Sequence, residues 1–166
     1  MQTEGKIILF SEIIAQLNKY DLVVEYDKPQ KEISFHKPET DSRLISENDI
    51  FICIKGYKFD GHNFAQSAVK NGAKLLICEQ KQAIAIPQII VKNSRKSAAV
   101  LAKYFFGNPS SKFKLIGITG TNGKTTISHI VEYLLRKNGK KTGLIGTLGY
   151  YINGKHFPLE RTTPDI

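Results

Sequence analysis

The chain has few cysteines and no long hydrophobic run, and each absence excludes a class of protein. Only two of the 166 residues are cysteine, Cys53 and Cys78, and neither has a companion cysteine or histidine at the spacing of a metal site. The sequence therefore predicts no disulfide framework and no zinc site, and we expect both thiols to be buried as small apolar side chains. No stretch approaches the ~18 apolar residues of a membrane span. Residues 1–10 also lack the pattern of a signal peptide, so we expect a cytoplasmic protein that does not bind membranes.

Acidic residues are scarce relative to basic ones. The chain has 24 Lys and Arg against 15 Asp and Glu, a formal charge of +9, in an otherwise ordinary globular composition with 41% hydrophobic and 23% charged residues. Such a charge suits nucleic acids, a membrane surface or small anionic substrates such as nucleotides. The basic residues are spread along the chain and are not interleaved with aromatic residues as in surfaces that stack bases. We therefore expect no nucleic-acid partner, and steeply salt-dependent binding to any nucleic acid would contradict this.

A cluster of turn-forming residues at 107–111, Gly-Asn-Pro-Ser-Ser, divides the sequence. Residues 1–109 are expected to form a first domain, and residues 112–166 the start of a second. Hydrophobic periodicity and apolar runs in the first domain predict helices and strands in a mixed α/β arrangement. The predicted helices cover 10–20, 63–71 and 94–106, and the predicted strands cover 33–36, 49–54, 74–78 and 88–91.

The second segment carries a strand, a glycine-rich turn and a helix in succession. Residues 113–118 predict the strand, and the turn at 119–126 reads Thr-Gly-Thr-Asn-Gly-Lys-Thr-Thr. A helix with one face packed on a sheet should follow, ended by Gly139, because its apolar residues recur at helical spacing at Ile127, Ile130, Val131, Leu134 and Leu135. Residues 141–146 predict a second strand at the distance of a right-handed crossover, which favours a parallel sheet.

The residues of this turn suit phosphate binding. Gly120 and Gly123 have no Cβ, so backbone N–H groups can approach phosphate oxygens, and the helix N-terminus adds partial positive charge. Lys124 can reach the outer phosphates, and the hydroxyl of Thr125 can bind a magnesium ion that bridges them. The strict phosphate-loop pattern requires glycine where this chain has Ile118, so the match is to a variant. The alternative is an ordinary glycine-rich turn with an exposed lysine.

The ten residues 117–126 resemble the ATP-binding loop of the Mur ligase superfamily. Further motifs similar to that family occur in the same order along the chain: Asp-Ser-Arg at 41–43, Asn-Asp-Ile-Phe at 48–51, Lys-Gly at 55–56, Asp-Gly-His-Asn-Phe at 60–64, Thr-Leu-Gly at 147–149 and Arg-Thr-Thr-Pro-Asp at 161–165. The last motif resembles the ligases that join a diamino acid to UDP-N-acetylmuramoyl-L-alanyl-D-glutamate in peptidoglycan precursor synthesis. The resemblance implies an α/β protein with a small mixed UDP-sugar-binding domain, followed by the first βαβ unit of a parallel-sheet P-loop ATPase domain.

The chemistry implied by the resemblance is an ATP-dependent amide ligation. The γ-phosphate of ATP passes to a substrate carboxylate, and the amine of the diamino acid attacks the resulting acyl phosphate. Position by position, the ATP loop would comprise Gly120, Thr121, Asn122, Gly123, Lys124, Thr125 and Thr126, with Lys124 as catalytic residue and Thr125 as magnesium ligand. The UDP-sugar would contact Thr40, Ser42, Tyr57, Lys58 and Phe59. The peptide-bearing end of the substrate would contact Arg161, Thr162 and Thr163.

Some of these motifs also have ordinary structural explanations. Asp-Ser-Arg at 41–43 could be a helix cap with a surface ion pair, and Asp-Gly-His at 60–62 could be a tight turn. The histidines do not occur in pairs at metal-ligand spacing, so no site formed by protein ligands alone is predicted.

Few acidic residues follow the phosphate loop. Beyond Lys124 the only ones are Glu132, Glu160 and Asp165, and none lies at the tip of a predicted strand where magnesium is usually held. The resembled ligases continue for several hundred residues, so we expect this chain to be an N-terminal piece that is inactive without the missing C-terminal domains. Two alternatives stay open: another Mur ligase, such as the one that adds the final dipeptide, or a stand-alone regulatory module that binds nucleotides.

Overall fold

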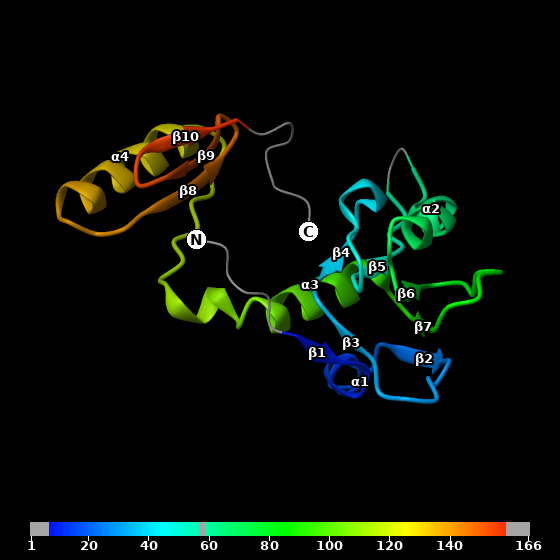
Figure 1. The fold of residues 1–166 in the computed structure, drawn as a ribbon. Helices are drawn as coiled ribbons and strands as arrows, with labels where there is room; N and C mark the ends of the chain where they lie inside the picture. The colour runs from blue at the N-terminus through cyan, green and yellow to red at the C-terminus, as the bar shows by residue number, and fades with distance from the viewer. Residues whose placement is uncertain (1–6, 57–58, 159–166) are drawn as a thin grey trace. The chain divides into compact units, whose positions relative to one another are not determined.

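A computed structural model describes residues 7–56 and 59–158 of the chain. The chain forms two compact units, Met1–Phe113 and Lys114–Asp165 (Figure 1). No helix within the described ranges is both long enough and apolar enough to cross a membrane.

The first unit contains a five-stranded sheet with the strand order β2-β7-β6-β5-β4. The strands are β2 (Val23–Tyr26), β4 (Pro38–Glu39), β5 (Ile50–Ile52), β6 (Leu75–Cys78) and β7 (Gln88–Val91). Strands β4 to β7 pair in parallel, and β2 adds antiparallel to β7. Every residue of β5, β6 and β7 is buried, as expected where both faces of a parallel sheet are covered.

Helices cover the two faces of this sheet and create two apolar clusters. The helices are α1 (Phe10–Asn18), α2 (Ala65–Lys70) and α3 (Ser94–Phe105), with short 3₁₀ turns η1 (Ser42–Leu44), η2 (Gly61–Phe64) and η3 (Pro109–Lys112). Along β6, Leu75 and Ile77 join the cluster that contains α1 and α3, whereas Leu76 and Cys78 join the cluster that contains α2. Cys53 lies in this second cluster too, so the prediction of two buried, unpaired thiols is confirmed.

A short antiparallel pair, β1 (Ile8–Leu9) with β3 (Ser34–Phe35), stands beside the main sheet. Phe35 and Ile8 are fully buried in the cluster that α1 and α3 share. The predicted strand at 33–36 is therefore confirmed but is shorter than expected, and it lies outside the five-stranded sheet.

The second unit consists of one helix and three antiparallel strands. Helix α4 (Lys124–Lys137) lies along the sheet formed by β8 (Gly143–Gly146), β9 (Gly149–Ile152) and β10 (Lys155–Phe157), in the order β10-β9-β8 (Figure 1). The predicted helix and its end near Gly139, which has φ +73°, are confirmed.

Two expectations for this unit are wrong in the structure. Residues 113–118 form no strand, and β8 pairs antiparallel with β9 rather than in parallel with an earlier strand. The reason is local: Asn153 and Gly154 have φ values of 50° and 82°, the left-handed pair that closes a tight hairpin, and Gly146 pairs with Gly149 across a second tight turn. These two turns pair β9 with both of its neighbours, so the antiparallel hairpins form between segments that are adjacent in the sequence.

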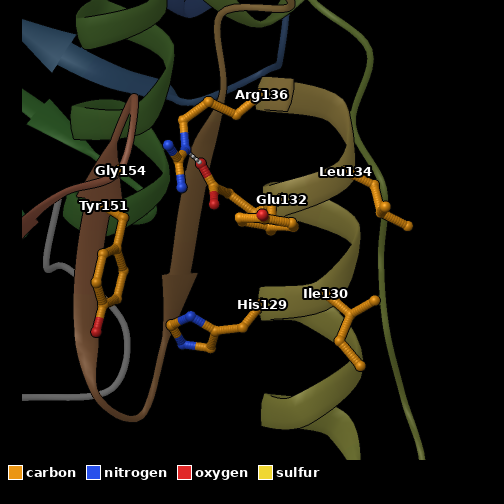
Figure 2. Close-up of a pocket in the computed structure, with 8 residues that line it drawn as sticks. His129, Ile130, Glu132, Leu134, Arg136, Tyr151 and Gly154 are labelled. Atoms are coloured by element: carbon orange, nitrogen blue, oxygen red, sulfur yellow. Dashed lines mark hydrogen bonds and ion pairs between the residues drawn. The ribbon is translucent and has the colours of Figure 1, made fainter. Parts of the chain in front are cut away.

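The apolar stripe of α4 is also not packed as predicted. Ile127, Ile130 and Leu134 are about half exposed, and Leu115 is 86% exposed. The side of α4 that faces the hairpins instead carries His129, Glu132 and Arg136 (Figure 2). Within the described residues, every hydrophobic side chain of the buried core belongs to the first unit.

Candidate functional site

The glycine-rich turn leads directly into α4, which begins at Lys124. Gly120 and Gly123 have φ values of +147° and +75°, backbone conformations that L side chains rarely adopt. Neither glycine is crowded, since the nearest atom to a Cβ on Gly123 would be Ile127 Cδ1 at 3.8 Å. Backbone conformation, rather than lack of space, therefore explains why glycine occupies these positions.

The turn presents unpaired backbone donors. No hydrogen bond within the described ranges takes its donor from the backbone N–H of residues 120–126. The first N–H groups of a helix have no acceptor within the helix, and they are commonly satisfied by an anion. The turn is therefore suited to hold phosphate oxygens.

Lys124 and Thr125 bring the charge and the hydroxyl to this turn. The ammonium of Lys124 donates to the backbone carbonyls of Gly120 and of Thr121, the latter at 3.3 Å, so it lies over the turn itself. Thr125 Oγ1 lies 3.4 Å from Thr147 Oγ1, at the end of β8. Thr147 belongs to a motif that sequence reasoning noted without giving the residue a role, because only the fold brings the end of β8 to the start of α4.

A metal ion would find hydroxyl ligands rather than carboxylates at this turn. Among residues 7–56 and 59–158, no group of three or more His, Cys, Asp or Glu side chains could hold a metal. Glu132 is engaged elsewhere, since it accepts hydrogen bonds from Thr142 Oγ1 at 2.6 Å and from Arg136 Nε at 3.2 Å. The residues present fit a phosphate group, and they fit magnesium through the hydroxyl of Thr125 together with oxygens of that phosphate.

A separate pocket of about 400 Å³ lies between α4 and the β9–β10 hairpin (Figure 2). The rings of His129 and Tyr151 meet edge to face at 4.9 Å on one side of it. At the other end, the guanidinium of Arg136 lies so close to Gly154 that a Cβ there would be 2.9 Å from Nε. None of the predicted site residues lines this pocket, and its contacts join the helix to the hairpin.

In the first unit, a loop between β4 and β5 carries Thr40 and Ser42. Glu39 Oε1 accepts hydrogen bonds from the backbone N–H of Thr40 at 2.8 Å and of Asp41 at 3.1 Å. Ser42 is buried, and its carbonyl accepts a hydrogen bond from Asn71 Nδ2 at 2.8 Å. The loop is thus fixed from β4 on one side and from the end of α2 on the other.

Asp41 caps the 3₁₀ turn η1 in this loop. Its carboxylate accepts from the backbone N–H of Arg43 at 3.0 Å and from the guanidinium, with Nη2 at 2.6 Å. These hydrogen bonds from Arg43 lower the pKa of Asp41 to about 2. The cap and ion pair considered for residues 41–43 are therefore both present, beside the buried Ser42.

A second loop of the first unit, at residues 55–60, carries Phe59. The backbones of Lys55 and Asp60 form an isolated antiparallel β-bridge that closes the ends of the loop. A 2.9 Å hydrogen bond from Gly56 N to Phe59 O lies inside it. Phe59 is 71% exposed and meets Phe64 edge to face at 6.4 Å. Sequence reasoning missed Phe64, although it ends the Asp-Gly-His-Asn-Phe motif. Tyr57 and Lys58 lie outside the described residues.

Asp60 and His62 form a hydrogen-bonded pair that resembles a catalytic dyad. Asp60 Oδ1 lies 2.6 Å from His62 Nδ1 and also accepts from His62 N at 3.0 Å, and these bonds lower the pKa of Asp60. The other ring nitrogen, Nε2, accepts from the backbone N–H of Glu79 at 3.1 Å. An imidazole that accepts at Nε2 carries its proton on Nδ1, so both nitrogens are occupied and His62 has a structural role.

The structure thus places the predicted residues in two groups. Thr40, Ser42 and Phe59 lie on loops of the first unit, and residues 120–126 form the turn before α4 in the second. Arg161, Thr162 and Thr163 lie outside the described residues.

Comparison with known proteins connects both groups to one family. Residues 34–105 match the Mur ligase family, catalytic domain, and residues 118–166 match the Mur ligase middle domain. The chain is 49% identical over 127 residues to a UDP-N-acetylmuramoyl-L-alanyl-D-glutamate--2,6-diaminopimelate ligase of Bacillus cereus. The matched region covers 76% of this chain and 26% of the relative. A ligase of the same name from Listeria monocytogenes is 49% identical over 125 residues, with 75% and 26% covered. The chain therefore spans about a quarter of the length of these curated relatives.

Solved structures agree with this assignment. The structure resembles MurF from Acinetobacter baumannii with a TM-score of 0.59 and 27% identity, over 81% of this chain and 29% of that one. It also resembles a UDP-N-acetylmuramoyl-L-alanyl-D-glutamate--2,6-diaminopimelate ligase with a TM-score of 0.62 over 91% of this chain and 30% of that one, where 24% identity supports the fold alone. From the two family matches and the close relatives, the chain belongs to the Mur ligase family.

Proposed function

We propose that this chain supplies the UDP-sugar-binding and phosphate-binding segments of an ATP-dependent ligase that adds a diamino acid to UDP-N-acetylmuramoyl-L-alanyl-D-glutamate. The observation that carries the proposal is the turn at 120–126, with its unpaired N–H groups and the Lys124 ammonium, in a chain 49% identical to ligases of that name. The other three quarters of such a ligase would contribute the remaining metal ligands and the site for the diamino acid. We expect such an enzyme to work in the cytoplasm.

In this proposal the turn binds the phosphates of ATP. The backbone N–H groups of residues 120–126 donate to phosphate oxygens, and Lys124 exchanges the carbonyls of Gly120 and Thr121 for an outer phosphate. The Thr125 hydroxyl would hold the magnesium ion that accompanies those phosphates, and that ion would neutralise part of their charge. ATP supplies the phosphoryl group that activates a substrate carboxylate for attack by an amine.

The two loops of the first unit bind the UDP-sugar. Thr40 and Ser42 lie on a loop that β4 and α2 hold in place, which suits a loop that must meet a ligand with little reorganisation. Phe59 offers an exposed ring face supported by Phe64, and a base could stack there. We assign Tyr57 and Lys58 to the same ligand, and Arg161, Thr162 and Thr163 to the peptide end of the substrate, on family resemblance.

We further propose that residues 1–109 and 112–166 belong to separate domains of that ligase. The first unit has its own sheet and two apolar clusters, which supports independent folding. The exposed apolar stripe of α4 supports the view that the second domain needs further chain to cover it.

A chimaera tests the whole proposal. The chain would be fused to the remaining part of the Bacillus cereus relative, and ADP release would be measured with UDP-N-acetylmuramoyl-L-alanyl-D-glutamate and 2,6-diaminopimelate. We expect ADP release only when ATP and both other substrates are present, and loss of it in Lys124→Ala. The proposal is wrong if a folded chimaera binds the UDP-substrate and ATP but releases no ADP.

A further inference from the structure

The ammonium of Lys37 lies among three oxygens from three separate parts of the first unit. It donates to the carbonyl of Leu44 at 3.1 Å and to Glu39 Oε2 at 3.2 Å, and it lies 3.8 Å from Asp49 Oδ2. Glu39 belongs to β4, Leu44 ends η1, and Asp49 immediately precedes β5. Lys37 is therefore the cation at which the start, the middle and the end of the β4–β5 connection meet.

Both carboxylates near Lys37 also order the connection. The other oxygen of Glu39 accepts the backbone N–H groups of Thr40 and Asp41. Asp49 Oδ2 also accepts from Ser46 N at 2.8 Å and so fixes the turn before β5. By holding the two carboxylates, Lys37 holds both ends of the segment that carries Thr40 and Ser42.

Lys37 is partly exposed, but one of the two carboxylates that it neutralises is buried. The Asp49 side chain is 1% exposed, and its Oδ1 atom has no hydrogen-bond partner among the described residues. Burial raises the pKa of Asp49, and the nearby charge of Glu39 raises it further, whereas the hydrogen bond from Ser46 N and the charges of Lys37 and His36 lower it. Without Lys37, the negative charges of Glu39 and the buried Asp49 would lose the cation that lies within 4 Å of both, and a buried charge without its partner is costly.

We infer that Lys37 is a positioning residue for the UDP-sugar site, acting through Glu39, Leu44 and Asp49 on the loop that carries Thr40 and Ser42. The inference rests on the proposed function for the identity of the ligand. The hydrogen bonds that fix the loop are observed whatever ligand the loop binds. Lys37 does not have to touch the ligand, since its three contacts are all with the protein.

Two measurements on the full chain test the inference. Calorimetry with UDP measures affinity, and amide hydrogen exchange measures the protection of Thr40 and Asp41. We expect Lys37→Met to weaken UDP binding about tenfold or more. Exchange at the two amides should rise about tenfold, while the amides of β6 keep their protection. The matched control is Lys31→Met, which removes an exposed lysine six residues earlier in the chain and should change neither quantity.

A conservative variant separates positioning from a general loss of stability. Lys37→Arg keeps the positive charge and can donate to the same carboxylates, so it should recover most of the UDP affinity lost in Lys37→Met. Recovery in Lys37→Arg supports the inference even if Lys37→Met also loses protection in β6. UDP affinity as weak in Lys37→Arg as in Lys37→Met would overturn the inference.

The remaining outcomes are also decisive. Equal UDP affinity in the wild type and Lys37→Met would overturn the role of Lys37. If the wild-type chain does not bind UDP at all, the proposed ligand of this loop is wrong. In that case unchanged exchange at Thr40 and Asp41 would also remove Lys37 as an ordering residue, and raised exchange would retain it.

Discussion

The backbone N–H of Glu79, just beyond β6, donates to His62 Nε2 at 3.1 Å, so a histidine that pairs with Asp60 also holds the end of a central strand. Glu79 in turn accepts from the backbone N–H of Ser94 at 2.8 Å, at the start of α3. A connected series of hydrogen bonds therefore joins η2, the end of β6 and the start of α3 at the carboxyl edge of the parallel sheet.

Removing the His62 ring should loosen this edge. We expect His62→Ala to lower the free energy of unfolding of the first unit by about 1–2 kcal/mol, because the Glu79 N–H loses its acceptor and η2 loses a contact. Urea unfolding followed by circular dichroism measures the change. His36→Ala, which removes an exposed ring, is the control and should change stability little. Equal stability of the two variants would contradict the structural role of His62.

Gly61 should not tolerate a side chain. A Cβ at this position would lie 2.6 Å from Ile54 N and 2.8 Å from Ile54 O, both backbone atoms that cannot move aside cheaply. We expect Gly61→Ala to lower the stability of the first unit by about 1–3 kcal/mol, as overpacking does. Gly146→Ala is the matched control, because a Cβ there meets nothing within 4 Å. Thermal unfolding compares the two, and an unchanged melting temperature in Gly61→Ala would refute the close contact.

The two thiols should be unreactive in the folded chain. Burial raises the pKa of Cys78 to about 11, and that of Cys53 rises as well. A raised pKa leaves less thiolate at about pH 8, and both side chains are also inaccessible to reagent. We expect negligible reaction with Ellman's reagent in native buffer and reaction of both thiols in guanidinium. Rapid labelling of the folded chain would show that the clusters around β5 and β6 open easily.

The ion pair at η1 should give stability that depends on pH in a defined direction. Arg43 lowers the pKa of Asp41 from 3.8 to about 2 in the folded chain. The ionised carboxylate therefore stabilises the fold above about pH 4. This contribution should disappear as the pH falls through about 2. We expect Asp41→Asn to have a slightly lower melting temperature than the wild type at about pH 6, with the difference shrinking toward about pH 2. A difference in melting temperature that grows as the pH falls would contradict this prediction.

The phosphate turn should bind phosphate on its own, and weakly. We expect the chain to bind ATP, ADP, GTP and pyrophosphate with similar low affinity that falls with salt, because the backbone N–H groups and Lys124 of the turn would contact the phosphates that these ligands share. Lys124→Ala should reduce pyrophosphate affinity about tenfold, whereas Lys140→Ala, at an exposed lysine beyond α4, should not. A strong, magnesium-dependent preference for ATP, or turnover of ATP by the chain alone, would favour the regulatory-module alternative.

Some elements could be predicted closely because their signals are local. The runs at Leu75–Cys78 and Gln88–Val91 are strands within one residue of the predicted limits, because four or five residues are too few for a helix and their length suits a buried strand. The glycine-rich turn and the helix after it were likewise predictable, because positive φ at Gly123 and helical spacing are properties of neighbouring residues. The same holds for the candidate phosphate site, whose residues are contiguous.

Other features depended on segments far apart in the chain. Strands β2 and β4 are short edge strands, and each pairs with a central strand that follows later in the chain, β2 with β7 and β4 with β5. The roles of Lys37, Phe64 and Thr147 were invisible in sequence, since each depends on a neighbour that folding brings near.

The sequence alone therefore determined the parts of this protein that obey local rules: its buried central strands, the glycine turn with Lys124, and the motifs that resemble Mur ligases. Tertiary structure decided the direction in which β8 pairs and the use of both nitrogens of His62. It also decided the position of Lys37 among three oxygens. The physical reason is that propensity and periodicity act between near neighbours, whereas a hydrogen-bond partner or a buried charge is specified only when distant segments meet.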